Sequence, residues 1–276
     1  RLGEIVVRGE QEATASTSTV QRISAAKILA SDAPTADRLA LIMPATRVQS
    51  NSRGEAILYM RNAGERQTAI FLDGALINIP WDNRLDLSLI PMNSIGGVTL
   101  SQGVASVLYG SNVLGGAVEF VSQELPTPGY LTDIGVAGGN DGYYSIQAMH
   151  TGNLGTFNYI ASANLMRRDA LSFPDSSVFQ ADGETPFLHN QFNADQRTNT
   201  DSRIFNAYAR GEVKLAERAS LGLSTSFIDA SKGVAPEGHV PDARFWRYPK
   251  WRNLSVVLNG DAQFGSDSQW DLRGAV

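Results

Sequence analysis

The stretch Phe157–Leu165, which reads FNYIASANL, alternates apolar or aromatic residues with polar ones for most of its length. In an extended chain Phe157, Tyr159 and Leu165 fall on one side, and Asn158 and Asn164 fall on the other. A period of two residues indicates a β-strand with one apolar face and one polar face. Its length is nearly twice the roughly five or six residues that are usual for a strand of a soluble sandwich.

The same alternation recurs throughout the chain after Gly129, and the segments between the predicted strands are of two kinds. Tight turns at 152–155, 216–218 and 265–268 alternate with a short excursion at 138–142 and longer polar excursions at 169–201 and 231–249. Short turns on one side and longer loops on the other are typical of an outer-membrane β-barrel, and Phe157, Tyr159 and Phe264 stand where its aromatic girdle belongs. A soluble sandwich also alternates and remains the alternative, but the strand length favours the barrel.

Composition excludes several other classes of protein. The chain has 276 residues, a formal net charge of -5 and no cysteine. An acidic chain offers no basic field to a nucleic acid, and without cysteine there are no disulfides, thiolate metal sites or cysteine nucleophiles. The sequence contains no apolar run of about 18 residues, so no membrane helix is predicted. A start at Arg1 without a signal-peptide pattern indicates a mature or trimmed terminus.

The first half follows a mixed α and β pattern. Asp73-Gly74 stands between two apolar runs, which is a strong signal for a two-residue hairpin. Gly110 is expected to end a short helix, and Gly115-Gly116 to let the chain reverse into the next strand. Helices are predicted at Ala25–Ala30 and Ala36–Met43, and strands at Ala56–Met60, Thr68–Leu72, Ile95–Leu100 and Ala117–Val121.

Three segments in this half resemble the plug domain of TonB-dependent outer-membrane receptors: Ala69–Asn78 (AIFLDGALIN), Asp86–Pro91 (DLSLIP), and Gly103–Gly110 with Leu114–Val118 (GVASVLYG and LGGAV). Together they cover about residues 53–122 in the expected order. The resemblance implies an α+β plug domain followed by antiparallel transmembrane β-barrel strands. It implies a TonB-box segment at 1–12, a plug at 13–126 and the first barrel strands at 127–276.

The chain also departs from the family pattern. Gln102-Gly103-Val104, Arg61-Asn62 and Gly96-Gly97 stand where the family usually has Arg-Gly-Pro, Arg-Gly and a charged pair. At these positions the resemblance therefore gives no basis for expecting an ion-pair latch between plug and wall that uses those arginines and acids.

The resemblance also implies where partners bind. Glu4, Ile5, Val6 and Val7 look like the segment gripped by TonB, the energising partner in the inner membrane. Family plugs present apical loops toward the outside, and here these would be 63–66 and 79–84. The expected solute contacts are Arg66, Trp81, Asn83 and Arg84, with packing of Trp81 on the barrel wall as the alternative.

A second candidate is the segment Arg244–Arg252, which interleaves basic and aromatic residues. Trp246 and Arg247 could hold an anionic, aromatic solute by charge and cation–π contact. The alternative, which is favoured, is an outer-leaflet aromatic girdle with the basic residues facing lipid phosphates.

The sequence gives no sign of an enzyme. His150, His189 and His239 are far apart, and no H-E-x-x-H or G-x-S-x-G motif exists, so no catalytic residue, cofactor or metal site is expected. The resemblance implies TonB-dependent uptake across the Gram-negative outer membrane, with an iron–siderophore complex as the default solute and outer-membrane lipid as the surroundings. Oligosaccharide or cobalamin uptake and a non-transporting adhesin or docking protein are the alternatives.

Completeness of the barrel gives one further expectation. About seven strands are predicted up to Val276, whereas plugged transporters close with about 22. Because an open sheet edge cannot persist in lipid, the remaining strands are expected beyond Val276 or on a partner chain.

Overall fold

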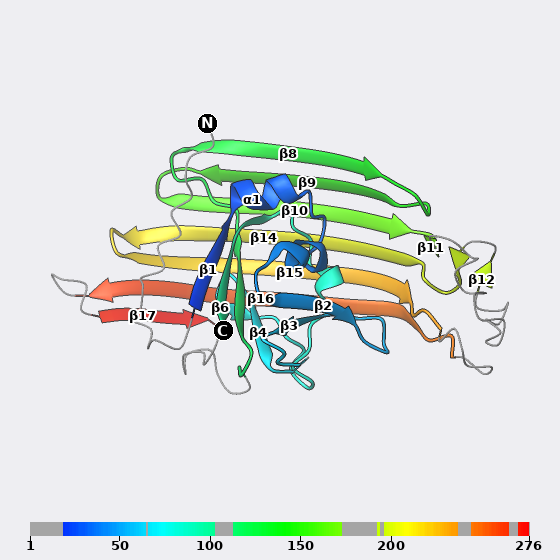
Figure 1. Cartoon of the computed structure of the whole chain (residues 1–276). Helices are drawn as coiled ribbons and strands as arrows, with labels where there is room; N and C mark the ends of the chain where they lie inside the picture. The colour runs from blue at the N-terminus through cyan, green and yellow to red at the C-terminus, as the bar shows by residue number, and fades with distance from the viewer. Residues whose placement is uncertain are drawn as a thin grey trace.

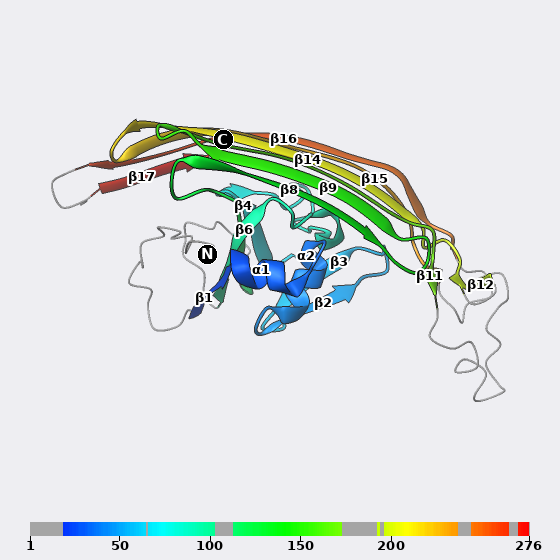
Figure 2. The same ribbon diagram turned by 90° about the horizontal axis from the view of Figure 1, so that it is seen from above.

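The computed structural model describes residues 19–64, 66–102, 113–172, 192–193, 196–236, 244–264 and 270–275. A small mixed domain, the plug, lies against a long curved sheet, the wall (Figure 1). Seen from above, the plug elements lie on the concave side of the wall (Figure 2). No helix in these ranges is long and apolar enough to span a bilayer.

The plug is built on a five-stranded sheet in the order β1-β6-β7-β4-β5. The pair β4–β7 is parallel and the other pairs are antiparallel. Its strands are β1 (Thr19–Ser24), β4 (Thr68–Leu72), β5 (Ala75–Leu76), β6 (Ile95–Gln102) and β7 (Gly116–Ser122).

Helices and a hairpin complete the plug. Their bounds are α1 (Ala25–Ser31), α2 (Ala36–Leu39), the 3-10 turns η1 (Ala40–Ile42) and η2 (Leu87–Leu89), and the hairpin β2 (Thr46–Ser50) with β3 (Ala56–Met60). The plug core joins these elements to the sheet through fully buried side chains such as Leu39, Met60, Leu87, Leu100 and Phe120.

The wall is a seven-stranded antiparallel sheet in the order β17-β16-β15-β14-β10-β9-β8. Its strands are β8 (Gly129–Gly138), β9 (Tyr144–Asn153), β10 (Phe157–Arg168), β14 (Ser202–Ala216), β15 (Ala219–Gly233), β16 (Arg247–Phe264) and β17 (Trp270–Ala275). A small separate sheet contains β11 (Leu171–Ser172), β12 (Phe192–Asn193) and β13 (Gln196–Arg197).

The apolar face of the wall points away from the plug. Ile134, Val136 and Leu254 expose 74%, 78% and 68% of their surface. The polar residues at the alternate, inward-facing positions are buried, and two of them, Asn164 and Asn206, lie opposite each other. An antiparallel sheet that exposes its apolar side and buries its polar side is the arrangement of a membrane β-barrel wall.

Most predicted elements are confirmed. The strands at Ala56–Met60 and Thr68–Leu72 have the predicted bounds, and Asp73-Gly74 forms the turn between β4 and β5. The helix expected at Ala36–Met43 divides into α2 and η1. The excursion expected to begin at Ser231 is shorter, because β15 continues to Gly233 and β16 begins at Arg247. The helix closed by Gly110, the turn at Gly265–Ser268 and Glu4–Val7 lie outside the described residues.

Candidate functional site

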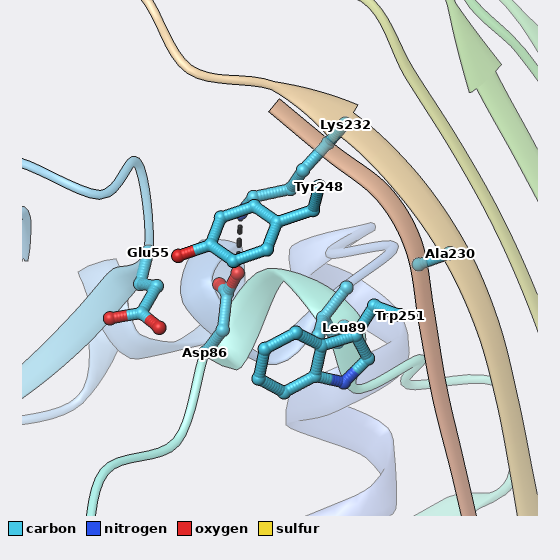
Figure 3. A pocket seen from close by; sticks show the side chains of 7 residues that line it. All are labelled: Glu55, Asp86, Leu89, Ala230, Lys232, Tyr248 and Trp251. Atoms are coloured by element: carbon cyan, nitrogen blue, oxygen red, sulfur yellow. Dashed lines mark hydrogen bonds and ion pairs between the residues drawn. The ribbon is translucent and has the colours of Figure 1, made fainter. Parts of the chain in front are cut away.

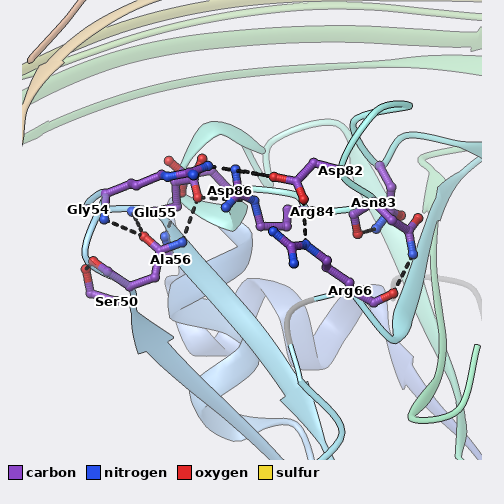
Figure 4. A network of polar contacts seen from close by, with 12 residues as sticks. Ser50, Gly54, Glu55, Ala56, Arg66, Asp82, Asn83, Arg84 and Asp86 are labelled. Carbon is purple, nitrogen blue, oxygen red and sulfur yellow. Dashed lines mark hydrogen bonds and ion pairs between the residues drawn. The ribbon is translucent and has the colours of Figure 1, made fainter. Parts of the chain in front are cut away.

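One end of the plug carries a network of charged loops, here called the crown: residues 51–55, 61–64, 66–67 and 79–86 (Figure 4). Asp82 is its centre. Its carboxylate meets Arg66 Nε at 2.5 Å, Arg84 Nη2 at 2.6 Å and Arg53 Nη1 at 3.7 Å. The hydrogen bond from Arg66, together with the charges of Arg84, Arg66 and Arg53, lowers the pKa of Asp82 below its usual value. The crown therefore holds an ionised carboxylate among three arginines.

Amide side chains tie the crown to the plug sheet. Asn83 has φ 51°, a left-handed conformation that asparagine tolerates better than most residues, and its Nδ2 donates to Arg66 O at 2.6 Å. Asn78 donates to Asn83 O at 2.9 Å and to Thr68 O at 3.1 Å, while its Oδ1 accepts from Ile70 N at 2.7 Å. The loop is thus fixed to β4, so its outward side chains have a rigid base.

Two of the predicted solute contacts are displayed on the crown surface. Trp81 is 83% exposed, and the side chain of Arg66 is 61% exposed. Trp81 does not pack on the seven described wall strands, and the alternative of packing elsewhere on the barrel wall is not tested by them. An exposed indole offers a large apolar face and one N–H donor to a solute.

Arg84 lies in a different environment from the one expected. Its side chain is 7% exposed and is placed between Asp82 and the buried Glu55, whose Oε2 is 3.6 Å from Arg84 Nε. Glu55 Oε2 in turn accepts from Asn51 Nδ2 at 2.7 Å. Arg84 is held within the protein by carboxylates, so it supports the crown from beneath.

Trp246 and Arg247 belong to the wall rather than to the plug. Arg247 Nη1 lies 2.9 Å from Asp201 Oδ1 and donates to Asn199 Oδ1 at 3.2 Å. The hydrogen bonding of Arg247 to the Asp201 carboxylate lowers the pKa of Asp201. Asn199 Nδ2 donates to Trp246 O at 2.7 Å, and the Arg244 guanidinium lies over the Trp246 ring at 5.6 Å. The two predicted residues are thus fixed to the segment that precedes β14.

A first link between crown and wall is the ion pair of Lys232 on β15 with Asp86. Lys232 Nζ also donates to Gly54 O at 2.7 Å, and Asp86 Oδ1 accepts from Ala56 N at 3.0 Å. Tyr248, Trp251 and Leu89 line a small pocket beside this pair (Figure 3). The pair is largely shielded from water, since Asp86 and Lys232 side chains are 3% and 12% exposed.

A second link joins the β4–β5 turn to the wall. Asp73 Oδ1 lies 3.2 Å from Arg210 Nη1 and accepts from Ser122 N at 2.8 Å, while its Oδ2 accepts from the Tyr208 hydroxyl. Arg210 also lies 3.2 Å from Glu124.

Sequence reasoning missed both links, although it placed Asp73 correctly in a turn. The sequence signal that could have revealed them is an arginine or lysine at a polar position of a strand in which apolar and polar residues alternate. Arg210 and Lys232 both occupy inward-facing positions of the wall. Both pairs connect plug and wall, beside the apolar contacts that Leu72 and Leu89 make with wall side chains.

Within the described ranges, no group of three or more His, Asp or Glu side chains is arranged to hold a metal. The crown combines an exposed tryptophan with an exposed arginine on loops that Asn78 and Asn83 tie to β4.

Comparisons with known proteins agree with this geometry. Residues 11–117 match the model of the TonB-dependent receptor plug domain. The chain is 28% identical over 114 residues to the vitamin B12 transporter BtuB of Photobacterium profundum, a match covering 41% of this chain and 19% of that protein.

Solved structures share the fold. The copper transporter OprC superposes with a TM-score of 0.67 at 14% identity, over 90% of this chain and 35% of its own. The siderophore receptor PirA from Acinetobacter baumannii gives 0.65 at 16% identity, over 89% of this chain and 38% of its own. The chain thus spans well under half of each relative. These relatives are transporters and receptors, which agrees at a coarse level with the expectation of no enzyme.

A plug on the polar face of an apolar-out antiparallel sheet defines the plug-and-barrel class of receptors. Residues 11–117 are a plug domain of the TonB-dependent receptor type, and the described residues after it form seven antiparallel strands with the fold of the barrel receptors that the chain resembles.

Proposed function

We propose that the chain is part of an active transporter that carries a scarce, large solute across the outer membrane of a Gram-negative bacterium. The observation that supports this most is the arrangement of plug and wall. The plug presents a crown with exposed Trp81 and Arg66. It is linked to the wall by the ion pairs of Asp73 and Asp86 and by two small apolar clusters around Leu72 and Leu89, separate from its own large core.

The source of energy follows from the location. The outer membrane has no nucleotide supply, so energy arrives from the inner membrane through TonB. Glu4–Val7 is the proposed contact for TonB, because a short β-prone segment on a Ser- and Thr-rich tether suits addition to the edge of a partner's sheet. In this proposal residues 1–12 form the TonB-box segment, 13–126 the plug and 127–276 the first barrel strands.

The proposed solute is an iron–siderophore complex. PirA, which shares the fold, is described as a siderophore receptor, and the exposed Trp81 and Arg66 suit an anionic ligand with aromatic groups. Cobalamin is the second candidate, because the sequence relative is a vitamin B12 transporter. Oligosaccharide uptake and a surface adhesin are the remaining alternatives.

Uptake and surface binding measured in parallel test this function. Cells carrying the full protein would be given radio-iron-loaded hydroxamate and catecholate siderophores, and radiolabelled cyanocobalamin. Val6→Pro should abolish uptake while leaving surface binding unchanged, since proline removes a main-chain N–H donor and fixes φ. Val6→Ala should do much less, because the backbone contacts persist.

Normal uptake by Val6→Pro would show that this segment is not the coupling site. Binding without energised uptake in the unaltered protein would instead favour the adhesin.

A further inference from the structure

The outward face of the wall carries three arginines beyond the end of its apolar band. Arg167 on β10 and Arg203 on β14 lie directly opposite each other, and Arg252 lies on β16. All three are exposed. The outward positions between Phe157 and Arg167 are Tyr159, Ala161, Ala163 and Leu165, and those between Val213 and Arg203 are Gly211, Ala209, Ala207 and Phe205.

Strand geometry gives the height of this row. From Phe157 to Arg167 the chain advances about 34 Å, at roughly 3.4 Å per residue. A strand tilted by about 40° then rises about 26 Å along the membrane normal, while the apolar band of such a wall is about 25 Å tall. The arginines therefore lie at the headgroup level of the leaflet on the side of the long loops.

The charge balance of the row is incomplete. Arg167 pairs with Asp169, with Nη2 and Oδ1 3.1 Å apart, and Arg252 pairs with Asp229. Within the described part of the chain the side chain of Arg203 has no hydrogen-bond or ion-pair partner. It stands instead across from the like charge of Arg167. Like charges directly opposite on a sheet are destabilising, so an anion between them would relieve repulsion as well as gain charge-assisted hydrogen bonds.

From this geometry we infer that Arg203, flanked by Arg167, binds a phosphate of the phosphorylated glycolipid of the outer leaflet. This inference rests on the proposed outer-membrane location. The planar guanidinium fork matches a phosphate bidentately, and two adjacent forks favour a headgroup with closely spaced phosphates. The glycolipid's acyl chains would lie along the partly exposed apolar residues next to the arginines on the same strands, Leu165 and Phe205.

Purified, delipidated full-length protein in neutral detergent tests the site, and no transport assay is needed. The probes are a diphosphorylated lipid A-type glycolipid, its dephosphorylated form, and phosphatidylglycerol, each measured by native mass spectrometry. The variants are Arg203→Gln and, as a matched control at the opposite end of the same wall, Arg218→Gln.

Arg203→Gln should weaken binding of the diphosphorylated glycolipid by about tenfold or more, since a hydrogen bond to a charged group is lost. Arg218→Gln should bind like the unaltered protein. Without lipid, Arg203→Gln should resist denaturant at least as well as the unaltered protein, because it removes a like-charge pair; a merely structural arginine would behave in the opposite way.

Equal glycolipid binding by Arg203→Gln and the unaltered protein would overturn the proposal. Equal binding of phosphatidylglycerol or of the dephosphorylated form would overturn the assignment to a phosphorylated glycolipid. Both binding measurements use purified protein and lipid, so their outcome does not depend on whether the protein carries out TonB-dependent uptake.

Discussion

Trp81 and Arg66 are the most exposed of the predicted solute contacts on the crown. Asn78 and Asn83 tie their two loops to each other and to β4. We expect Trp81→Ala together with Arg66→Ala to weaken solute binding by about tenfold or more, because buried aromatic and arginine contacts dominate most interfaces. The barrel should still fold, since exposed loop residues contribute little to stability. Equilibrium binding of the solute identified by uptake measures the effect.

Lys27→Ala, which removes an exposed basic residue on α1, is the control for net charge. Unchanged affinity in the double variant would move the binding site to the wall loops, where Trp246 and Arg247 are the next residues to replace.

Asp82 gives the crown a defined dependence on pH. Its pKa lies below its ordinary value of 3.8, chiefly because Arg66 hydrogen-bonds to the carboxylate. A lowered pKa means that the stabilisation is present above 3.8 and is lost as the pH falls through the lowered pKa. The crown should therefore remain ordered from neutral pH down to about the lowered pKa of Asp82 and loosen only in stronger acid.

Asp82→Asn should loosen the crown already at neutral pH, because it removes the charge that holds Arg53, Arg66 and Arg84. Cleavage by trypsin after Arg53 or Arg66 measures this loosening at neutral pH. Cleavage by pepsin measures the loosening of the crown across the acidic range. Equal cleavage of the variant and the unaltered protein at neutral pH would contradict it.

At the level of elements, the start of β7 depends on one glycine. Gly116 has φ 132°, and a Cβ placed on it would lie 2.3 Å from Ser101 O on the paired strand β6. Gly74 also has a positive φ of 81°, but a Cβ there would meet nothing within 4 Å. An alanine at Gly74 would therefore add backbone strain alone, whereas an alanine at Gly116 would add a steric clash as well.

We expect Gly74→Ala to cost about 1–2 kcal/mol from the left-handed conformation alone. Gly116→Ala should cost clearly more, because β6 and β7 must also move apart. Hydrogen exchange of the β6 and β7 amides in the full protein would show this, with protection lost in Gly116→Ala and kept in Gly74→Ala. Equal protection in both would mean that the plug sheet yields easily at this point.

The elements that the sequence predicted are those whose pattern is local. Alternation over Phe157–Leu165 and the apolar runs around Asp73-Gly74 determine strand and turn without reference to the rest of the chain. The parallel pairing of β4 with β7 joins Thr68–Leu72 to 116–120, and no local pattern specifies a partner so distant in sequence. β2 was missed because its residues, Thr46–Ser50, are mostly polar and gain strand geometry only from β3.

The candidate site was predictable only in outline. A Trp among charged loop residues predicted either a solute platform or packing on the barrel wall, and Trp81 is 83% exposed among the described residues. Arg84 has the same local character, yet it is buried because Glu55 and Asp82 approach it from other parts of the plug. Such burial depends on tertiary contacts between loops, which composition does not reveal.

At the scale of the whole molecule, the ion pair of Lys232 with Asp86 fixes the crown to the wall. Lys232→Met should leave Asp86 buried without its cation, a change that typically costs about 3–5 kcal/mol. We expect the amides of 51–58 and 86–92 to exchange hydrogen faster in the variant. Lys250→Met, at an exposed position of β16, is the matched control.

The double variant Lys232→Met with Asp86→Asn should recover part of the protection, because the uncompensated charge is gone. If Lys232→Met alone exchanges like the unaltered protein, the pair does not hold the plug on the wall.

The position of β1 has a mechanical consequence. Among the described strands it is an edge strand paired with β6, and it begins at Thr19, directly after the proposed tether of the proposed TonB contact Glu4–Val7. Tension applied through the tether would load β1 before any other part of the plug, and α1 with its buried Ile28 would follow. A pull across the strands would break the β1–β6 ladder one pair at a time from Thr19 and Gln102, whereas a pull along them would load the whole ladder at once. The direction of the applied force, more than its size, would then decide how readily the plug opens.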